Sequence, residues 1–352
     1  MKIDGVPHRS IWLSDNGWSV LIFDQRKLPW RVAIAELTTI ESAARAIKEM
    51  WTRGAPLIGA TAAYGLSLGL RADPSDSALE RDYQTLLATR PTAVNLRWAL
   101  DRMKSAVEPH QGDRRVAAAY ECARAICDED VETNRSIGEH GVPLIDAVAR
   151  EKPGHAVQIL THCNAGWLAT VDYGTALAPI FLAHDRGVPL HVWVDETRPR
   201  NQGASLTAFE LRHHGVPHTV IADNAGGLLM QQGKVDLCIV GTDRVARNGD
   251  VCNKIGTYLK ALAAHDNKVP FYIALPLSTF DRSVATGGEI PIEERSADEV
   301  TVIHGRDEAG TITSVRITDS PASNPAFDVT PARLVTGYIT ENGVTSSSGL
   351  LR

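Results

Sequence analysis

The sequence predicts an α/β protein, in which a Rossmann-like parallel-sheet domain follows a smaller, mostly helical domain that has a short β start. Two observations predict this class. From about residue 151 onward, short apolar segments rich in Val and Ile alternate with amphipathic segments. Ahead of that point, Ala-rich stretches with helical periodicity follow a strand-like beginning. We therefore expect two domains, at residues 1–150 and 151–352.

The N-terminal domain is predicted to begin with strands and to continue with helices. Residues 18–25 and 31–37 have the composition of strands and are separated by a turn at Pro29. The pattern becomes helical near Thr39, and prolines separate several of the helical pieces. The predicted helices cover residues 40–50, 57–71, 77–89, 92–107 and 115–138.

The second domain has the pattern of consecutive βαβ units. Its apolar segments carry no polar alternation, which is typical of strands that are buried on both faces of a parallel sheet. The amphipathic segments at residues 203–215 and 253–266 are predicted to be helices between these strands. The predicted strands are residues 156–161, 190–196, 218–223, 236–243 and 271–276.

Composition excludes several classes of function. The hydrophobic fraction of 43% and the charged fraction of 22% are those of a globular enzyme. A net charge of -6 argues against a nucleic-acid partner but allows a local site for one small phosphate. No apolar run reaches the ~20 residues of a membrane helix, and the N-terminus lacks the pattern of a secretory signal. Five cysteines, few and odd in number, argue against a disulfide framework and favour the cytoplasm.

Polar residues gather where the predicted strands end. Ligands of open parallel sheets bind beyond the carboxyl ends of the strands, where the connecting loops converge. Asn253 and Lys254 are expected at the start of the helix that follows this edge. The other polar sequences at the strand ends are THCNAG (161–166), DETRPRNQG (195–203), DN (223–224) and GTDR (241–244).

Cys163 and Asp243 are the candidate chemical groups. Cys163 is predicted to lie where a strand passes into a helix, and a helix N-terminus favours the thiolate. The alternative is that Cys163 packs as a small hydrophobic side chain. Asp243 follows an apolar strand, so its carboxyl group can act as a general acid if burial raises its pKa. Its alternative role, a helix N-cap, is weakened because the next residues do not resemble a helix start.

A phosphate site is predicted at Arg53-Gly54-Ala55, ahead of an apolar helix. A guanidinium group, a conformationally permissive glycine and the free amides of a helix start together suit an anion. By itself the signal is weak, because many Arg-Gly pairs only form turns. Arg90 is equally ambiguous, and a solvated side chain is the default interpretation of Lys254.

Cofactor and metal motifs are missing. No G-x-G-x-x-G follows a predicted strand, and the glycine spacing before Lys234 does not match a phosphate-binding P-loop. The sequence contains no H-E-x-x-H and no paired C-x-x-C. We therefore expect neither an organic cofactor nor a metal.

The sequence resembles the methylthioribose-1-phosphate isomerases of methionine salvage. The segments DETRPRNQGA (195–204) and GTDRVARNGD (241–250) are long and specific, and the matching motifs extend over nearly the whole chain in the family's order. One departure is NAGG (224–227), where an alanine usually precedes a single glycine. Other matching motifs are RGAPLIGATAAYG (53–65), TRPTAVNLRWA (89–99), LTHCNAGWLAT (160–170) and NPAFDVTPARLVTGYIT (324–340).

The resemblance implies an activity, a site and an assembly. The implied reaction converts 5-methylthioribose 1-phosphate to its 1-phosphoketose, with Cys163 and Asp243 as the catalytic pair, in a homodimer. The positions that match the sugar-phosphate ligands of the family are Arg53, Gly54, Ala55, Arg90, Gln202, Asn253 and Lys254.

Two alternatives remain open on the sequence. Related aldose-1-phosphate isomerases act on 5-deoxyribose 1-phosphate or ribose 1,5-bisphosphate, and Cys163 and Asp243 do not separate these substrates. Regulatory subunits of the translation-initiation exchange factor share the fold but generally lack both motifs. For the enzyme, the hydrogen moves either as a proton carried by a Cys163 thiolate or as a hydride that shifts directly.

Overall fold

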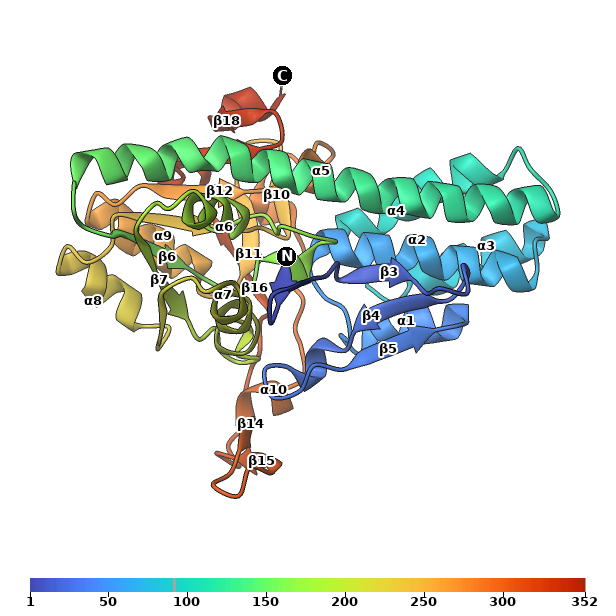
Figure 1. Cartoon of the computed structure of the whole chain (residues 1–352), viewed down its shortest axis with the longest axis horizontal. Coiled ribbons are helices and arrows are strands. Elements are labelled where there is room, and N and C mark those ends of the chain that lie inside the picture. Colours follow the sequence, from blue (N-terminus) through green and yellow to red (C-terminus); the bar gives the residue numbers. More distant parts are fainter. Residues whose placement is uncertain (91–92, 352) are drawn as a thin grey trace.

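The computed structural model describes residues 1–90 and 93–351 and has a helical half and a sheet half (Figure 1). The helical half begins with a two-stranded ribbon and a three-stranded antiparallel sheet. The strands of the ribbon and the sheet are β1 (Lys2–Ile3), β2 (Val6–Pro7), β3 (Ile11–Leu13), β4 (Val20–Phe23) and β5 (Ile34–Leu37). The helices are α1 (Ile40–Lys48), α2 (Ala55–Ala72), α3 (Asp76–Leu87), α4 (Val94–Val107) and α5 (Asp113–Glu151). The predicted β start and helices are therefore present; residue 92, the first of the fourth predicted helix, lies outside the described residues.

Helix α2 is the centre of the helical half. It is apolar around nearly its whole circumference and is packed by α1, α3, α4 and α5, as expected of a helix without a solvent-facing stripe. Its neighbour α1 begins at a capping box formed by Thr39 and Ser42, and Ser75 caps α3. The burial of α2 fixes the position of its N-terminus, which points Arg53-Gly54-Ala55 toward the sheet half.

Helix α5 connects the two halves. It is longer than the predicted helix at 115–138 and runs through Pro143 to Glu151. It packs against α2 and α4 in one half and against α6 and β6 in the other, as its course across Figure 1 shows. A division into domains at residue 150 stays a prediction, because the helix ending there contributes to both halves.

The main sheet has seven strands in the order β18-β17-β12-β9-β6-β7-β8. All neighbours pair in parallel except β17 and β18. When the six parallel strands are numbered along the chain and read from β8 to β17, their order is 3-2-1-4-5-6. This is the order of doubly wound nucleotide-binding folds. The predicted Rossmann-like sheet is thus confirmed. The strands are β6 (Val157–Thr161), β7 (Leu190–Asp195), β8 (His218–Ile221), β9 (Leu237–Val240), β12 (Phe271–Ala274), β17 (Gly337–Thr340) and β18 (Gly343–Thr345).

Apolar side chains cover both faces of this sheet. Ile159 and Val192 belong to a core with α5 and α6, whereas Leu160 and Val240 belong to a core with α8 and α9. Alternate residues of one strand therefore enter different cores, which explains the unbroken apolar runs of the sequence. The connecting helices are α6 (Ala178–Asp185), α7 (Ala208–His214), which follows a π-helical turn at 203–207, α8 (Ala225–Gln231) and α9 (Thr257–Asp266).

The predicted helix start at Asn253 and Lys254 is wrong. Asn253 and Lys254 do not open a helix; they end β11, and α9 begins three residues after Lys254, at Thr257. The cause is pairing with distant segments, since β11 lies between β10 and β16 in a second, four-stranded sheet. The strands of this sheet are β10 (Arg244–Ala246), β11 (Val251–Lys254), β13 (Phe280–Asp281) and β16 (Phe327–Thr330).

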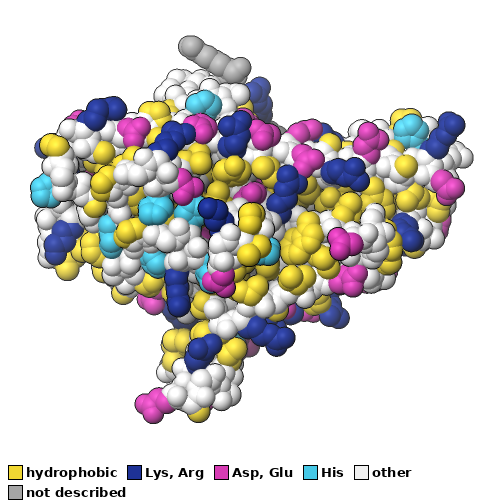
Figure 2. Space-filling model, in the orientation of Figure 1, with side chains coloured by type: hydrophobic (Ala, Val, Ile, Leu, Met, Phe, Trp, Pro, Cys, Tyr) yellow, Lys and Arg dark blue, Asp and Glu magenta, His cyan; other side chains and the backbone are white. Residues whose placement is uncertain are grey.

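A hairpin projects from the body of the molecule. It consists of β14 (Val302–Arg306) and β15 (Ile312–Arg316), follows the short α10 (Asp298–Thr301), and extends downward in Figure 1. Over the face drawn in Figure 2, acidic and basic side chains are interspersed and form no single basic patch. Within residues 1–90 and 93–351, no helix is both long and apolar enough to span a bilayer.

Candidate active site

Cys163 and Asp243 lie at the point where the strand order of the main sheet reverses. Cys163 follows the last residues of β6, and Asp243 follows those of β9. These two strands are neighbours, and their connections leave in opposite directions along the sheet. In folds of this type, the crevice that binds ligands opens here. The structure brings both side chains to one small cavity, whose walls also include Arg53, Gly54, Ala55 and Asn253.

The expected helix N-terminus at Cys163 is not present. After β6 the chain is irregular except for one helical turn at 167–169, and α6 begins only at Ala178. Cys163 itself adopts a φ of 66°, which is uncommon for a residue other than glycine. Hydrogen bonds hold this conformation, because its amide donates to Thr197 Oγ1 at 2.9 Å and its carbonyl accepts from Thr207 Oγ1 at 2.7 Å.

Side chains from other elements supply the positive charge near Cys163. Burial raises the pKa of the Cys163 thiol, while the charges of Arg53 and Lys254 lower it in part. Arg53 comes from the residues before α2, and Lys254 from the end of β11. The electrostatic support that the sequence ascribes to a helix dipole thus comes from two cations instead.

Asp243 has the desolvated environment predicted for a general acid. Burial raises the pKa of its carboxyl group, and the cations Lys254, Arg53 and Arg90 oppose this rise. Its backbone amide donates to the Cys252 carbonyl at 3.0 Å. Strand β10 follows Asp243 directly, so the alternative role as a helix N-cap is excluded.

Arg53 and Gly54 form the start of α2 at the cavity. The Arg53 guanidinium donates to Asn164 twice, through one nitrogen to its side-chain oxygen and through another to its carbonyl oxygen, the latter at 2.7 Å. Gly54 has a φ of 97°, and a Cβ there would lie 2.3 Å from the Ala169 carbonyl oxygen. Only glycine permits this approach of α2 to the segment after β6.

Lys254 and Asn253 approach the cavity from β11. Lys254 is buried, donates to the Ala326 carbonyl at 2.7 Å and lies 4.4 Å from the centre of the Phe327 ring. Burial lowers the pKa of its ammonium group, and the negative charges of Cys163 and Asp243 oppose this. No carboxylate among the described residues pairs directly with the Lys254 ammonium. This buried cation is therefore suited to an anionic ligand.

Arg90 and Gln202 line adjoining cavities. Arg90 shares one with Asp243 and Ala55, and its guanidinium lies 3.3 Å from a Glu293 carboxylate oxygen. Gln202 shares a larger one with Arg53. Its buried Oε1 has no hydrogen-bond partner in the described part of the chain. These two residues thus stand beside the cavity of Cys163 and are joined to it through Asp243 and Arg53.

Glu210, on α7, is not among the residues predicted for the site, but it accepts a hydrogen bond from Asn164 in the cavity wall. Its side chain is fully buried, which raises the pKa of the carboxyl group to about 7 against the effect of hydrogen bonds from Asn164, Leu168 and Trp167. Glu210 falls within the segment 203–215 that is predicted to be helical. An acidic residue in an amphipathic helix ordinarily faces solvent. The one sequence signal for a buried role of Glu210 is that it falls on the apolar side of this helix.

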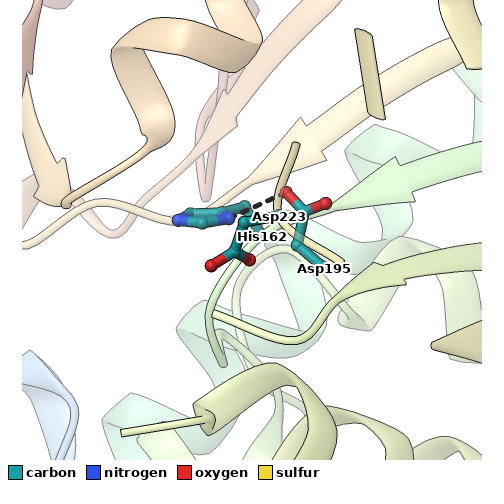
Figure 3. A group of neighbouring side chains, drawn as sticks. All are labelled: His162, Asp195 and Asp223. Carbon is teal, nitrogen blue, oxygen red and sulfur yellow. Dashed lines mark hydrogen bonds and ion pairs between the residues drawn. The ribbon is translucent and has the colours of Figure 1, made fainter. Parts of the chain in front are cut away.

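His162, Asp195 and Asp223 form a compact group (Figure 3), and they lie at the ends of β6, β7 and β8 respectively. Their potential ligand atoms lie within 4.8 Å of one another. However, His162 uses both ring nitrogens, one for Asp195 and one for the Ile255 carbonyl, each at 2.8 Å. The Lys260 ammonium lies 3.2 Å from Asp195, and the Asp223 carboxylate accepts two backbone amides at 2.7 Å. Both nitrogens of His162 and both oxygens of Asp223 already have partners, and Asp195 Oδ1 is the one oxygen of the group without a hydrogen-bond partner among the described residues. Because the Lys260 ammonium already lies against Asp195, this set does not fit a resident metal.

Comparisons with known proteins agree with the resemblance seen in the motifs. Residues 51–347 match the model of the initiation factor 2 subunit family. Curated relatives named methylthioribose-1-phosphate isomerase include one from Acidiphilium cryptum, 65% identical over 99% of this chain and 95% of its own length. Another, from Paramagnetospirillum magneticum, is 64% identical over 99% and 97% of the two chains.

Two solved structures are similar over nearly the whole chain. The 5-methylthioribose 1-phosphate isomerase of Pyrococcus horikoshii OT3 superposes with a TM-score of 0.83 at 42% identity, covering 97% of this chain and 93% of that one. The translation initiation factor eIF-2B, subunit delta, of A. fulgidus gives 0.79 at 38% identity, covering 97% and 96%. On these identities, and on the family match over most of its length, the chain belongs to the methylthioribose-1-phosphate isomerase family, within the broader initiation factor 2 subunit family.

Proposed function

We propose that this chain isomerises 5-methylthioribose 1-phosphate to 5-methylthioribulose 1-phosphate, a step of methionine salvage. One observation carries the proposal: Cys163 and Asp243 line the same buried cavity in a chain that is 65% identical to a relative named for this reaction. The reaction moves one hydrogen from C2 to C1 and turns an aldose phosphate into a ketose phosphate. An acid and a base that face one sugar phosphate suffice for it.

Asp243 is the proposed acid. A sugar phosphorylated at C1 cannot open its ring by the usual route, because its anomeric oxygen is held in a phosphate ester. Ring opening therefore needs a proton on the ring oxygen, and the donor has to hold that proton near neutral pH. The burial that raises the pKa of Asp243 supports this role.

Cys163 is the proposed base. As a thiolate it takes the C2 proton and returns it to C1 through an enol phosphate. The nearby charges of Arg53 and Lys254 support the thiolate by lowering its pKa against the effect of burial. In the competing route a hydride shifts directly from C2 to C1, and Cys163 then only shapes and desolvates the cavity.

The phosphate is proposed to bind to cations and amides around the start of α2. Arg53 offers a guanidinium held by Asn164, and Gly54 and Ala55, at the start of α2, line the same cavity, so their backbone amides are the proposed donors to the phosphate. Lys254 has no carboxylate in direct contact within residues 1–90 and 93–351, and its charge acts on both Cys163 and Asp243, so it is the proposed second cation. The remaining proposed ligands of the sugar phosphate are Arg90, Gln202 and Asn253.

Two rival functions are tested by one assay. The 38% identity to an initiation-factor subunit raises the possibility of a regulatory role without catalysis, and related isomerases accept other groups at C5. The purified chain should be given 5-methylthioribose 1-phosphate, 5-deoxyribose 1-phosphate and ribose 1,5-bisphosphate. We expect the highest kcat/KM for the first. Turnover of none of the three would refute an isomerase, and a preference for another would reassign the substrate.

The proposal includes a homodimer in the cytoplasm. The five cysteines are all free thiols, in keeping with a reducing compartment. The dimer rests on the family resemblance. Sedimentation of the purified chain at the mass of one subunit, 38.1 kDa, instead of two, would contradict it.

A further inference from the structure

The Glu210 carboxylate holds the segment that follows β6. Its Oε2 accepts the Trp167 amide at 2.8 Å, and its Oε1 accepts the Leu168 amide at 3.1 Å and the Asn164 side-chain amide at 2.8 Å. The contact is close, because a Cβ at Gly166 would lie 1.8 Å from a Glu210 oxygen. The segment that carries Cys163 is therefore anchored on one fully buried acid.

Asn164 transmits the position of Glu210 to Arg53. Its amide nitrogen donates to Glu210, and its side-chain oxygen accepts from the Arg53 guanidinium. A flipped Asn164 would place its nitrogen against another donor and its oxygen against another acceptor. As a carboxylate, Glu210 has no proton to donate, so only the nitrogen end of Asn164 can face it, and the oxygen end is left for Arg53.

The same carboxylate positions the backbone beside Gly54. Leu168, whose amide donates to Glu210, is followed by Ala169, the residue that packs against Gly54. Glu210 thus acts on Arg53 through a side chain and on the start of α2 through the backbone. Both targets line the cavity of Cys163 and Asp243.

We propose that Glu210 is a positioning residue for phosphate binding, which orients the Arg53 guanidinium toward the cavity through the side chain of Asn164. The inference rests on the proposed function only in taking Arg53 as a phosphate ligand. A role limited to packing does not explain a buried carboxylate here, because an apolar side chain would fill the same place without the cost of desolvation.

The test compares Glu210→Gln with Asn164→Ala and with the double variant. Glu210→Gln keeps the shape but puts an amide nitrogen against hydrogen-bond donors. We expect it to raise KM for the sugar phosphate about tenfold, with kcat changed less than about threefold, since a lost ground-state contact lowers binding uniformly. Calorimetry with inorganic phosphate should show a similar loss of affinity and needs no turnover.

Asp130→Asn is the matched control. Asp130 is only half-buried by its exposed surface, but desolvation likewise raises the pKa of its carboxyl group to about 7, and it accepts the Val171 amide of the same segment at 2.7 Å. We expect Asp130→Asn to leave KM and phosphate affinity unchanged, because its side chain contacts neither Asn164 nor Arg53 among the hydrogen bonds of the described residues.

The outcomes separate the two proposals. Failure of the unaltered chain to isomerise the substrate contradicts the proposed function, whereas phosphate binding still tests Glu210. A Glu210→Gln variant that behaves as Asp130→Asn does, with unchanged phosphate affinity, overturns the positioning role. So do fully additive effects in the double variant, because residues acting through one contact are non-additive. If Glu210→Gln does not fold, unchanged phosphate affinity in Asn164→Ala overturns the proposal, and a tenfold loss supports it.

Discussion

Asp243 acts on the ionisation of Cys163 across the cavity at the ends of β6 and β9. The charge of Asp243 adds to the effect of burial in raising the pKa of the Cys163 thiol, and the cations Arg53 and Lys254 lower the pKa of both groups. An acid that keeps its proton and a thiol that can lose one are the two states that the proposed reaction needs. Removing either cation should therefore raise the pKa of both the Cys163 thiol and the Asp243 carboxyl group.

Asp243→Asn should abolish most activity without loss of stability. A general acid typically contributes on the order of 10²–10⁴ in rate, so kcat should fall by about that factor. Because burial raises the folded-state pKa of Asp243, its ionisation costs stability as pH rises from the unfolded-state pKa through the folded-state pKa. The asparagine variant escapes that cost above this range.

The check is a pair of thermal unfolding curves at neutral pH, together with kcat. We expect the Tm of Asp243→Asn to equal or exceed that of the unaltered chain. A clearly lower Tm, or an unchanged kcat, would contradict the placement of Asp243 as a buried acid.

Lys254→Met should make the Cys163 thiol harder to ionise. The Lys254 ammonium lowers the pKa of this thiol, so its removal shifts the alkylation of Cys163 by iodoacetamide to higher pH. Mass spectrometry of the modified peptides follows each cysteine separately. The half-buried Cys122, whose thiol faces Arg102, is the internal control and should not shift. An unchanged profile at Cys163 would show that Lys254 does not act on it.

Gly54→Ala should destabilise the fold more than a glycine replacement in open space. Gly54 combines a positive φ with a predicted Cβ clash on Ala169, for a cost of roughly 2–5 kcal/mol. Gly154 has a φ of 82° and open space, so Gly154→Ala isolates the backbone cost of about 1–2 kcal/mol. Denaturant unfolding gives both values. Equal costs at the two positions would contradict the close approach of α2 to the segment after β6.

Chelation should leave turnover intact, because the proposed phosphate ligands are cations and amides. The group of His162, Asp195 and Asp223 already has a cation in place, since the Lys260 ammonium lies 3.2 Å from Asp195. Activity that disappears with EDTA and returns with a divalent ion would refute the proposed absence of a metal.

Arg53→Ala should mainly raise KM, since the guanidinium is proposed as a ligand of the phosphate rather than of the reacting carbon.

Local sequence pattern is sufficient to predict the main sheet and the placement of Cys163 and Asp243 at one edge of it. Cys163 and Asp243 directly follow apolar strands, and the carboxyl edge of a parallel sheet brings such positions together. The strand assignment of Asn253 and Lys254 depends on pairing with Asp328 and Phe327, more than 70 residues away along the chain. No local pattern contains that information. The helical pattern of the residues that follow therefore extends the predicted helix back to Asn253.

The electrostatics of the site were similarly beyond local pattern. The sequence suggested a helix dipole at Cys163, but the cations near it come from residues 53 and 254. Glu210 resembles any acidic residue of an amphipathic helix until its contacts with Asn164 and Trp167 are known. Which charges face one another is a property of the packed fold rather than of any one segment.

The most direct measurement of the central claim uses 5-methylthioribose 1-phosphate labelled with deuterium at C2. NMR should show the ketose forming with the unaltered chain, with part of the label lost to solvent, and almost no ketose with Cys163→Ser or Asp243→Asn. Complete retention of the label at C1 would favour the hydride route over the thiolate base, although a shielded base can also retain label. No ketose from the unaltered chain, or an undiminished rate in both variants, would contradict the assignment of this pair to the isomerisation.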